Sequence, residues 1–249
     1  MRLPDFIIGG APRSGTTWLY ALLDRHPDVF MARPAAPEPK FFLVDDLYEK
    51  GLEYYADTWF STAGAARRAG EKSTDYLESS AAAARMARDV PRVQLIFILR
   101  EPAERAYSNY LWTRTNGLET QDFASALIAE DERERTLTDR LRFARPYSYF
   151  SRGLYADLLA RYFDRFPRRQ LLVLKFEDIV DRPADLAARV HRFLGITPRP
   201  GDAAGLGVIN ASMKEQTGLD EAVRRELTAR YAEPNRRLAA LLGPDFELW

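Results

Sequence analysis

The feature that most constrains the fold is an apolar run near the N-terminus that breaks into a glycine-bounded loop and then resumes with helical spacing. It occupies residues 6–19 and reads FIIGGAPRSGTTWL. Gly10 and Gly15 have the G-x4-G spacing of a phosphate-binding loop. In such a loop the glycines let the backbone approach phosphate oxygens, and the first N–H groups of the next helix point at them. The stretch predicts a strand, a phosphate loop and a helix.

The loop differs from a Walker A sequence. Thr16 follows Gly15 where Walker A has Lys, Thr17 adds a second hydroxyl, and Arg13 is the cation inside the loop. A loop of this composition can hold a phosphate without the lysine that magnesium-bound triphosphate sites use. The competing interpretation is an ordinary strand-to-helix turn without a ligand.

The sequence after the first glycine carries a family resemblance. Residues 13–19 resemble the 5′-phosphosulfate loop of sulfotransferases that use 3′-phosphoadenosine-5′-phosphosulfate (PAPS), including the carbohydrate and heparan-sulfate type and bacterial relatives. The family pattern there is Lys or Arg, any residue, Gly-Thr-Thr and an apolar helix. The resemblance implies an α/β, P-loop-like three-layer fold with a central parallel sheet of four or five strands flanked by helices. It also implies nucleotide contacts from Arg13, Ser14, Gly15, Thr16, Thr17 and Trp18.

A proline-rich segment follows the first predicted helix. Glu38 lies between Pro37 and Pro39, which stiffen the backbone and exclude regular structure. The segment resembles the family's Lys-Glu-Pro-x-Phe-Phe stretch, whose Glu is the proposed base, so the resemblance implies that Glu38 is the base. Pro37 stands where the family has Lys, and a solvated turn is the alternative interpretation.

The sequence EKSTDY at residues 71–76 is similar to the family's Glu-Lys-Ser/Ala-Thr/Pro-x-Tyr segment. In that segment the Lys faces the sulfonate and the bridging oxygen, which implies a catalytic role for Lys72 beside Arg13. The residues before it, 64–70, are rich in Ala, Gly and Arg and are interpreted as a linker. Lys72 is accordingly expected in a loop, where an isolated Lys is ordinarily solvated.

The clearest predicted strand is the apolar run at 93–99, which is typical of a strand buried on both faces of a parallel sheet. Arg100 follows it, and Pro102 opens a new helix. This arrangement resembles the family's 3′-phosphate motif, in which a strand-end Arg and a Ser two turns into the helix bind one phosphate. Arg100 and Ser108 have the required separation, and the nucleotide is expected across the carboxyl ends of the strands.

Later segments give weaker signals. Residues 121–143 are rich in charges of both signs and predict a solvated helical face. Arg152, Gly153 and Tyr155 lie where family members show a Gly-x-Tyr near the nucleotide, and Tyr155 is taken as a binding residue. Lys214 lies where the family has a loop over the nucleotide, although the usual basic signature is missing. A further buried strand is expected at 171–176, and one or two terminal helices at 219–242, interrupted at Pro234.

Composition narrows the function classes. Lys and Arg total 36, as do Asp and Glu, so no net charge favours nucleic acid as a partner. The sequence has no Cys and two His, His26 and His191, which are expected to be structural, and no metal is predicted. It shows neither a signal-peptide pattern nor a membrane-length apolar run. A single domain over residues 1–249 is expected, in the cytoplasm and without integral membrane association.

The predicted activity is transfer of a sulfonate from PAPS to a hydroxyl of a small-molecule, glycan or lipid acceptor, with an amine as the second choice of acceptor group. Net neutrality disfavours a heavily sulfated polymer as acceptor. Two alternatives remain: a P-loop kinase acting on a small molecule, which would require a metal, and a nucleotide-binding module without turnover. The acceptor and the oligomeric state are left open.

Overall fold

The computed structural model describes residues 1–207, 218–244 and 246–249. Lys214, predicted to contact the nucleotide, lies outside the described residues. The chain divides into two compact units. The first takes in residues 1–99 and 161–207, and the second takes in residues 100–160 and the described residues from 218 onward.

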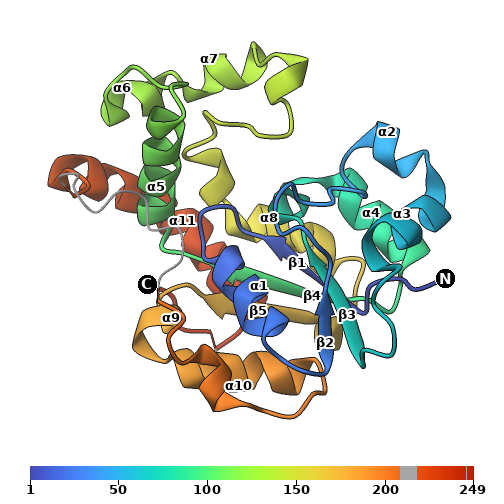
Figure 1. The fold of residues 1–249 in the computed structure, drawn as a ribbon. Helices are drawn as coiled ribbons and strands as arrows, with labels where there is room; N and C mark the ends of the chain where they lie inside the picture. The colour runs from blue at the N-terminus through green and yellow to red at the C-terminus, as the bar shows by residue number, and fades with distance from the viewer. Residues whose placement is uncertain (208–217, 245) are drawn as a thin grey trace. The chain divides into compact units, whose positions relative to one another are not determined.

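The first unit is built on a five-stranded sheet in the order β2-β3-β1-β4-β5 (Figure 1). All four strand pairings are parallel. Every residue of β1 and all but the first residue of β4 are buried, as expected for strands covered on both faces. The predicted parallel sheet is therefore confirmed. The strands are β1 (Phe6–Gly10), β2 (Val29–Met31), β3 (Arg68–Lys72), β4 (Gln94–Leu99) and β5 (Leu171–Lys175).

Helices cover both faces of this sheet. On one face, Trp18 and Leu22 of α1 and Val190 of α10 belong to one buried cluster with Ile96 and other strand side chains. On the other face, the ring of Tyr162, near the end of α8, lies 4.8 Å from that of Phe97. The helices of this unit are α1 (Thr16–Asp24), α2 (Asp45–Tyr48), α3 (Gly51–Phe60), α4 (Ser80–Asp89), α9 (Asp178–Asp181) and α10 (Pro183–Phe193), with 3-10 turns at Thr74–Glu78, Arg168–Gln170 and Pro200–Ala203.

The second unit is helical over its described residues. Its core is rich in aromatic side chains, among them Tyr110, Phe123, Tyr149 and Tyr231, all of which are buried. Helix α8 (Tyr155–Phe163) begins in this unit and ends in the first. The other elements are α5 (Pro102–Thr115), α6 (Phe123–Ile128), α7 (Glu130–Arg135) and α11 (Glu221–Leu242), with 3-10 turns at Asp139–Leu141 and Ser151–Gly153.

One short strand, β3, differs from the sequence prediction. Residues 68–70 belong to β3 rather than to a linker, and Lys72 is the last residue of that strand rather than part of a loop. The sequence RAGEK has no β-branched or aromatic residue, so it carries none of the usual strand signal. A tertiary contact explains its composition: a Cβ on Gly70 would lie 2.2 Å from the ring of Phe6. Strand β3 needs a residue without a side chain where β1 places its aromatic ring.

The charged stretch at 121–143 is largely helical with mostly exposed or half-buried charges, as predicted, and Glu130 is the exception. It forms α6, α7 and a 3-10 turn, and Glu130 at the start of α7 is buried. The Glu130 carboxylate accepts the backbone N–H groups of Phe150 and Ser151 at 2.6 and 2.8 Å. The terminal helix α11 runs through Pro234 without the predicted interruption. Charge pattern alone could not show which acid turns inward, because its partners are backbone groups about 20 residues away.

Candidate active site

The β1–α1 loop has the backbone geometry of a phosphate loop. Gly10 and Gly15 have φ angles of 152° and 89°, which glycine adopts readily, and Arg13 between them also has a positive φ of 65°. Gly15 is the N-cap of α1 and offers no side-chain cap to the helix. The first-turn N–H groups and the positive end of the helix dipole therefore favour an anion at this end of α1.

Packing fixes the shape of this loop. A Cβ on Gly15 would lie 2.5 Å from Ile179 and 2.9 Å from Phe176, so a larger residue does not fit there. Ser14 is fully buried. Trp18 is also buried, and its indole N–H donates to the carbonyl oxygen of Leu206 at 3.0 Å. The Trp18 side chain thus belongs to the core, so its predicted contact with the nucleotide would not come from the indole N–H.

The structure brings two of the three predicted catalytic residues into direct contact. Lys72 Nζ forms an ion pair with Glu38 Oε1, and the two side chains are only 7% and 13% exposed. The Thr74 N–H donates to Glu38 Oε2 at 3.0 Å, and the Thr74 hydroxyl lies 3.2 Å from the same oxygen. Glu38 is therefore held by a cation, a backbone donor and a hydroxyl, all supplied by β3 or the residues directly after it.

A second ion pair lies in the same two segments and was not anticipated from the sequence. Lys40 Nζ pairs with Asp75. Lys40 has a positive φ of 50°, and its backbone N–H donates to the hydroxyl of Ser73 at 2.9 Å. The chain directly after Glu38 is thus joined to the residues after β3 by an ion pair and by a backbone N–H to hydroxyl hydrogen bond.

Glu71, next to Lys72 in β3, is the functional group that sequence reasoning missed. Its carboxylate is fully buried and accepts hydroxyl hydrogen bonds from Ser73 (2.6 Å), Tyr55 (2.8 Å) and Tyr76 (2.9 Å). Burial raises the pKa of Glu71 to about 7, and the three hydroxyl donors only partly oppose that rise. The sequence shows an acid at this place but not that its partners are all uncharged.

The predicted 3′-phosphate residues lie in the second unit. Arg100 directly follows β4, and its guanidinium lies 3.4 Å from the carboxylate of Glu104. The Tyr155 hydroxyl donates to the Arg100 carbonyl oxygen at 2.9 Å, which joins two of the predicted binding residues. Ser108 is buried within α5.

The two weaker candidates beside Tyr155 have structural contacts. Arg152 donates to the carbonyl oxygen of Ala144 at 2.9 Å and to the side-chain oxygen of Asn109 at 3.3 Å. Gly153 packs so closely on Tyr231 that a Cβ would lie 2.5 Å from its hydroxyl oxygen. These contacts within the second unit explain why an arginine occurs at position 152 and a glycine at position 153.

One cluster of possible metal ligands occurs among the described residues. It consists of His26, His191 and Asp202, whose ligand atoms lie within 4.8 Å of one another. The backbone N–H groups of Asp28 and Arg199 donate to the Nδ1 atoms of His26 and His191, respectively. Each ring therefore carries its proton on Nε2, and that of His26 points to the Thr197 carbonyl oxygen at 2.9 Å.

The proton positions make this cluster a poor metal site, because a neutral imidazole binds a metal through an unprotonated nitrogen. Burial, followed by the neighbouring His26, lowers the pKa of His191 to about 4, so it is uncharged at neutral pH. The two histidines pack edge to face with ring centroids 4.9 Å apart. We assign them to packing, as expected from the sequence.

Comparison with known proteins gives a consistent result. A family model described as "Sulfotransferase domain" matches residues 3–213. The chain is 31% identical over 207 residues to human bifunctional heparan sulfate N-deacetylase/N-sulfotransferase 2, covering 79% of this chain and 22% of that protein. It is 33% identical over 195 residues to human heparan sulfate glucosamine 3-O-sulfotransferase 3B1, covering 78% of this chain and 47% of that protein. The chain thus spans less than half the length of these relatives.

Solved structures of sulfotransferases resemble the fold of this chain. A sulfotransferase from Alicyclobacillus acidocaldarius superposes with a TM-score of 0.82 at 28% identity, covering 100% of this chain and 98% of that one. Mouse sulfotransferase SULT7A1, in complex with PAP, superposes with a TM-score of 0.62 at 15% identity, which is a likeness of fold alone. Among the described residues, no helix combines the length and apolar character needed to cross a bilayer.

Proposed function

The chain belongs to the sulfotransferase family, and we propose that it transfers a sulfonate from PAPS to an acceptor hydroxyl. The observation that carries the proposal is the Glu38–Lys72 ion pair. Lys72 is the last residue of β3 and lies opposite Ile8 of β1. The ion pair therefore lies at the carboxyl ends of the strands, where the phosphate loop also begins. A carboxylate and a cation at that edge are what proton removal and leaving-group neutralisation require.

In the proposed reaction the acceptor oxygen attacks the sulfur in line with the departing group. A new S–O bond forms to the acceptor while the S–O bond to the 5′-phosphate breaks. Glu38 takes the hydroxyl proton, and the products are a sulfate ester and 3′-phosphoadenosine-5′-phosphate (PAP). Arg13, Lys72 and the N-terminal end of α1 neutralise the charge that returns to the 5′-phosphate.

Lys72 has two roles in this scheme. In the structure its ammonium group pairs with Glu38, which keeps both charges compensated in a nearly buried place. When donor and acceptor bind, Lys72 shifts toward the sulfonate and the bridging oxygen. Thr74 then remains as the donor that orients Glu38, through its backbone N–H and its hydroxyl.

For the other end of the nucleotide we propose that Arg100 and Ser108 bind the 3′-phosphate. Tyr155 supports this assignment by fixing the Arg100 backbone from α8. We also propose that Lys214 contacts the nucleotide. We propose further that the chain is a single sulfotransferase domain, because the family model matches residues of both units.

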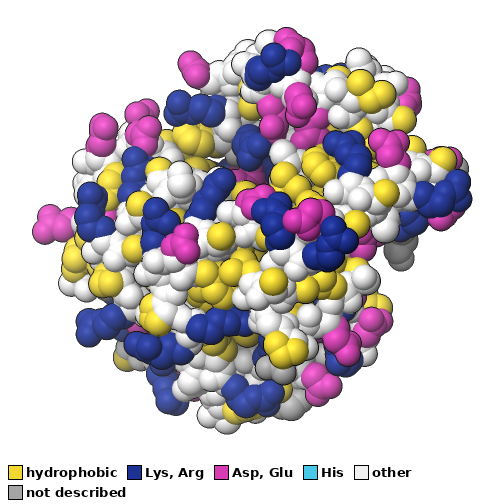
Figure 2. All heavy atoms as spheres, turned by 180° about the vertical axis from the view of Figure 1, so that it is seen from behind, with side chains coloured by type: hydrophobic (Ala, Val, Ile, Leu, Met, Phe, Trp, Pro, Cys, Tyr) yellow, Lys and Arg dark blue, Asp and Glu magenta, His cyan; other side chains and the backbone are white. Residues whose placement is uncertain are grey.

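The acceptor class is proposed more broadly: a small-molecule, glycan or lipid hydroxyl. The relatives are named for heparan sulfate, which favours a glycan. Basic and acidic side chains are intermixed on the face seen in Figure 2. With equal numbers of basic and acidic residues in the chain, this favours a weakly charged acceptor over a densely sulfated one. A cytoplasmic location and the absence of a nucleic-acid partner are proposed on composition alone.

The direct test is calorimetry with PAP, with and without EDTA, followed by transfer assays with radiolabelled PAPS across acceptor classes. We expect binding that is unchanged by EDTA, because the loop has Thr16 where magnesium-triphosphate loops have Lys. Binding abolished by chelation would favour a kinase. Binding of PAP without transfer to any acceptor would leave a nucleotide-binding module.

A further inference from the structure

We propose that Glu71 is a positioning residue that fixes the Glu38 segment, defined as residues 38–42, through two hydroxyl relays. The effect on turnover rests on the proposed function, but the positioning itself does not. Each relay runs from a backbone N–H of the segment to a hydroxyl oxygen, and from that hydroxyl's hydrogen to the Glu71 carboxylate.

The first relay passes through Ser73. Its hydroxyl accepts the Lys40 N–H at 2.9 Å and donates to Glu71 Oε2 at 2.6 Å. The second passes through Tyr76, whose hydroxyl accepts the Phe42 N–H at 3.2 Å and donates to Glu71 Oε1 at 2.9 Å. Together the two relays hold the backbone at Lys40 and Phe42, two and four residues after Glu38.

The direction of both relays depends on an ionised carboxylate. A hydroxyl has one hydrogen, and a carboxylate accepts only, so Ser73 and Tyr76 can donate to Glu71 while their oxygens stay open to the backbone N–H groups. A protonated Glu71 would have to donate to one of its three hydroxyl partners. Where Ser73 or Tyr76 takes that hydrogen, its own hydrogen has to turn away from Glu71, and the backbone hydrogen bond from Lys40 or Phe42 is weakened, which is costly at buried groups.

The groups around Glu71 set the pH at which its carboxylate takes up a proton. Tyr55 from α3 and Tyr76 from the turn after β3 are buried, and their pKa values lie well above 10, so both keep their protons. Glu38 of the segment raises the pKa of Glu71 slightly, and Ile7 of β1 lies opposite it in the sheet. Lys72, beside Glu71 in the strand, pairs with Glu38, and Lys40 pairs with Asp75. Because burial dominates, Glu71 titrates near pH 7.

Tyr55 provides a matched control. Its hydroxyl also donates to Glu71 Oε1, but it touches the segment through its ring, which stacks on Phe41 at 4.3 Å between centroids. Tyr55→Phe and Tyr76→Phe each remove one buried hydroxyl donor from Glu71. Of these two, Tyr76→Phe also removes the acceptor of the Phe42 N–H.

The first experiment is hydrogen–deuterium exchange of the Lys40 and Phe42 amides in the full chain without ligand, at pH 8. Glu71→Gln should speed exchange of both amides by about tenfold, the size of one weakened buried hydrogen bond. Tyr76→Phe should do so for Phe42, and Tyr55→Phe for neither. Unchanged exchange in Glu71→Gln, or equal effects of the two tyrosine variants, would overturn the proposal.

The second experiment measures turnover with radiolabelled PAPS and a desulfated heparan oligosaccharide, together with PAP affinity by calorimetry. Glu71→Gln should lower kcat about tenfold and leave the Kd for PAP unchanged. The wild-type kcat should fall as pH drops through 7, and that fall should vanish in Glu71→Gln. An equal loss of PAP affinity would overturn the positioning role. Failure of the wild type to bind PAP would instead refute the proposed function, and the exchange result would then decide on Glu71 alone.

Discussion

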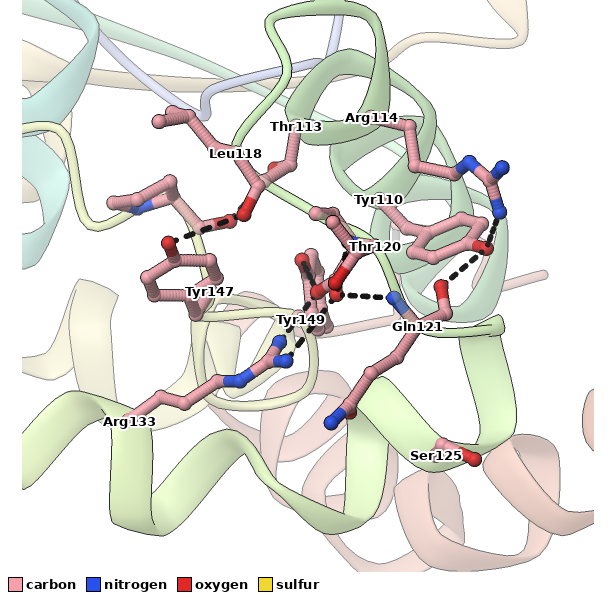
Figure 3. Close-up of polar contacts among 12 residues, drawn as sticks. Tyr110, Thr113, Arg114, Leu118, Thr120, Gln121, Ser125, Arg133, Tyr147 and Tyr149 are labelled. Atoms are coloured by element: carbon pink, nitrogen blue, oxygen red, sulfur yellow. Dashed lines mark hydrogen bonds and ion pairs between the residues drawn. The ribbon is translucent and has the colours of Figure 1, made fainter.

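Glu71 in the first unit and Glu119 in the second are both buried carboxylates, but they are stabilised by different kinds of donor. Glu119 is 0% exposed at its side chain and pairs with Arg133, whose Nη2 lies 3.2 Å away. It also accepts the Tyr149 hydroxyl at 2.7 Å and two backbone N–H groups at 2.9 Å each, from Thr120 and Gln121 (Figure 3). Within the described part of the chain, Glu71 has three hydroxyls and no cation among its hydrogen-bond partners.

The difference shows that the balance between burial and the surrounding donors sets the pKa of a buried acid. Burial alone would raise the pKa of Glu119, but the contacts from Arg133, Tyr149 and the backbone outweigh it and lower that pKa. At Glu71 burial prevails and the pKa rises to about 7. Glu119 therefore stays ionised, and keeps its contacts with Arg133 and Tyr149, at all moderate pH values. Glu71 instead changes charge close to neutrality.

The largest expected effect concerns the site beside Glu71. Glu38→Gln should lower kcat by ~10²–10⁴, because a general base typically contributes that much, while the Kd for PAP stays within about twofold. Steady-state transfer from PAPS and calorimetry with PAP measure the two quantities. As a control, Glu119→Gln should leave kcat unchanged at a temperature where the variant is folded. Near-normal turnover of Glu38→Gln would assign the base to another residue.

The next effect concerns stability in the second unit. Glu119→Gln should reduce the free energy of unfolding by about 2–4 kcal/mol, since it leaves the Arg133 charge without its buried partner. Arg133 is partly exposed, which keeps the loss below that of a fully buried pair. Urea denaturation at pH 8 gives the value. A loss no larger than that of Glu71→Gln would break the distinction between the two acids.

The third prediction follows from the opposite pKa shifts. A rise in pKa from 4.5 to about 7 means that folded Glu71 binds its proton more tightly than the unfolded chain does. Ionising it costs roughly 3 kcal/mol of stability, a cost present above pH 7 and relieved as pH falls from about 7 to 4.5. Glu119, with a lowered pKa, instead contributes stability above about pH 4.5 that is lost on further acidification.

Denaturation of wild type and Glu71→Gln across pH 5–8 isolates the Glu71 contribution. The wild type should gain stability relative to the variant as pH falls through this range. Parallel curves for the two proteins would show that the Glu71 pKa is near its ordinary value. The combination expected here is a site that gains stability and loses activity as it takes up a proton.

The smallest effect concerns ligand binding by the second unit. Arg100→Ala should weaken PAPS binding by about 1.5–3 kcal/mol and leave an analogue without the 3′-phosphate almost unaffected, since the lost contact is a charge-assisted hydrogen bond. Competition binding with both ligands measures the difference. Equal losses would assign Arg100 to structure, like Arg133, rather than to the nucleotide.

The elements with strong local signals were predictable from the sequence. The apolar runs of β1 and β4 and the loop between β1 and α1 were predicted correctly. Glu38 and Lys72 were each singled out by a motif, but their ion pair was not predicted. Strand β3 was missed because its residues are small or charged and its burial comes from neighbouring strands.

The two buried acids were missed for a related reason. The partners of Glu71 include Tyr55, 16 residues earlier, and those of Glu119 include Tyr149, 30 residues later. Periodicity within either segment carries no trace of such contacts. Whether an acid faces water, a guanidinium or only hydroxyls is decided by tertiary packing.

The close approach of Phe6 to Gly70 implies that these two positions evolve as a pair. They face each other in the β1–β3 register, and the aromatic ring occupies the volume that a Cβ at position 70 would need. A homologue with Ala or Ser at position 70 should therefore carry a side chain smaller than Phe at position 6. Side-chain volume lost at position 6 would be replaced by side-chain volume at position 70. The distance between β1 and β3, next to the phosphate loop, would then stay the same.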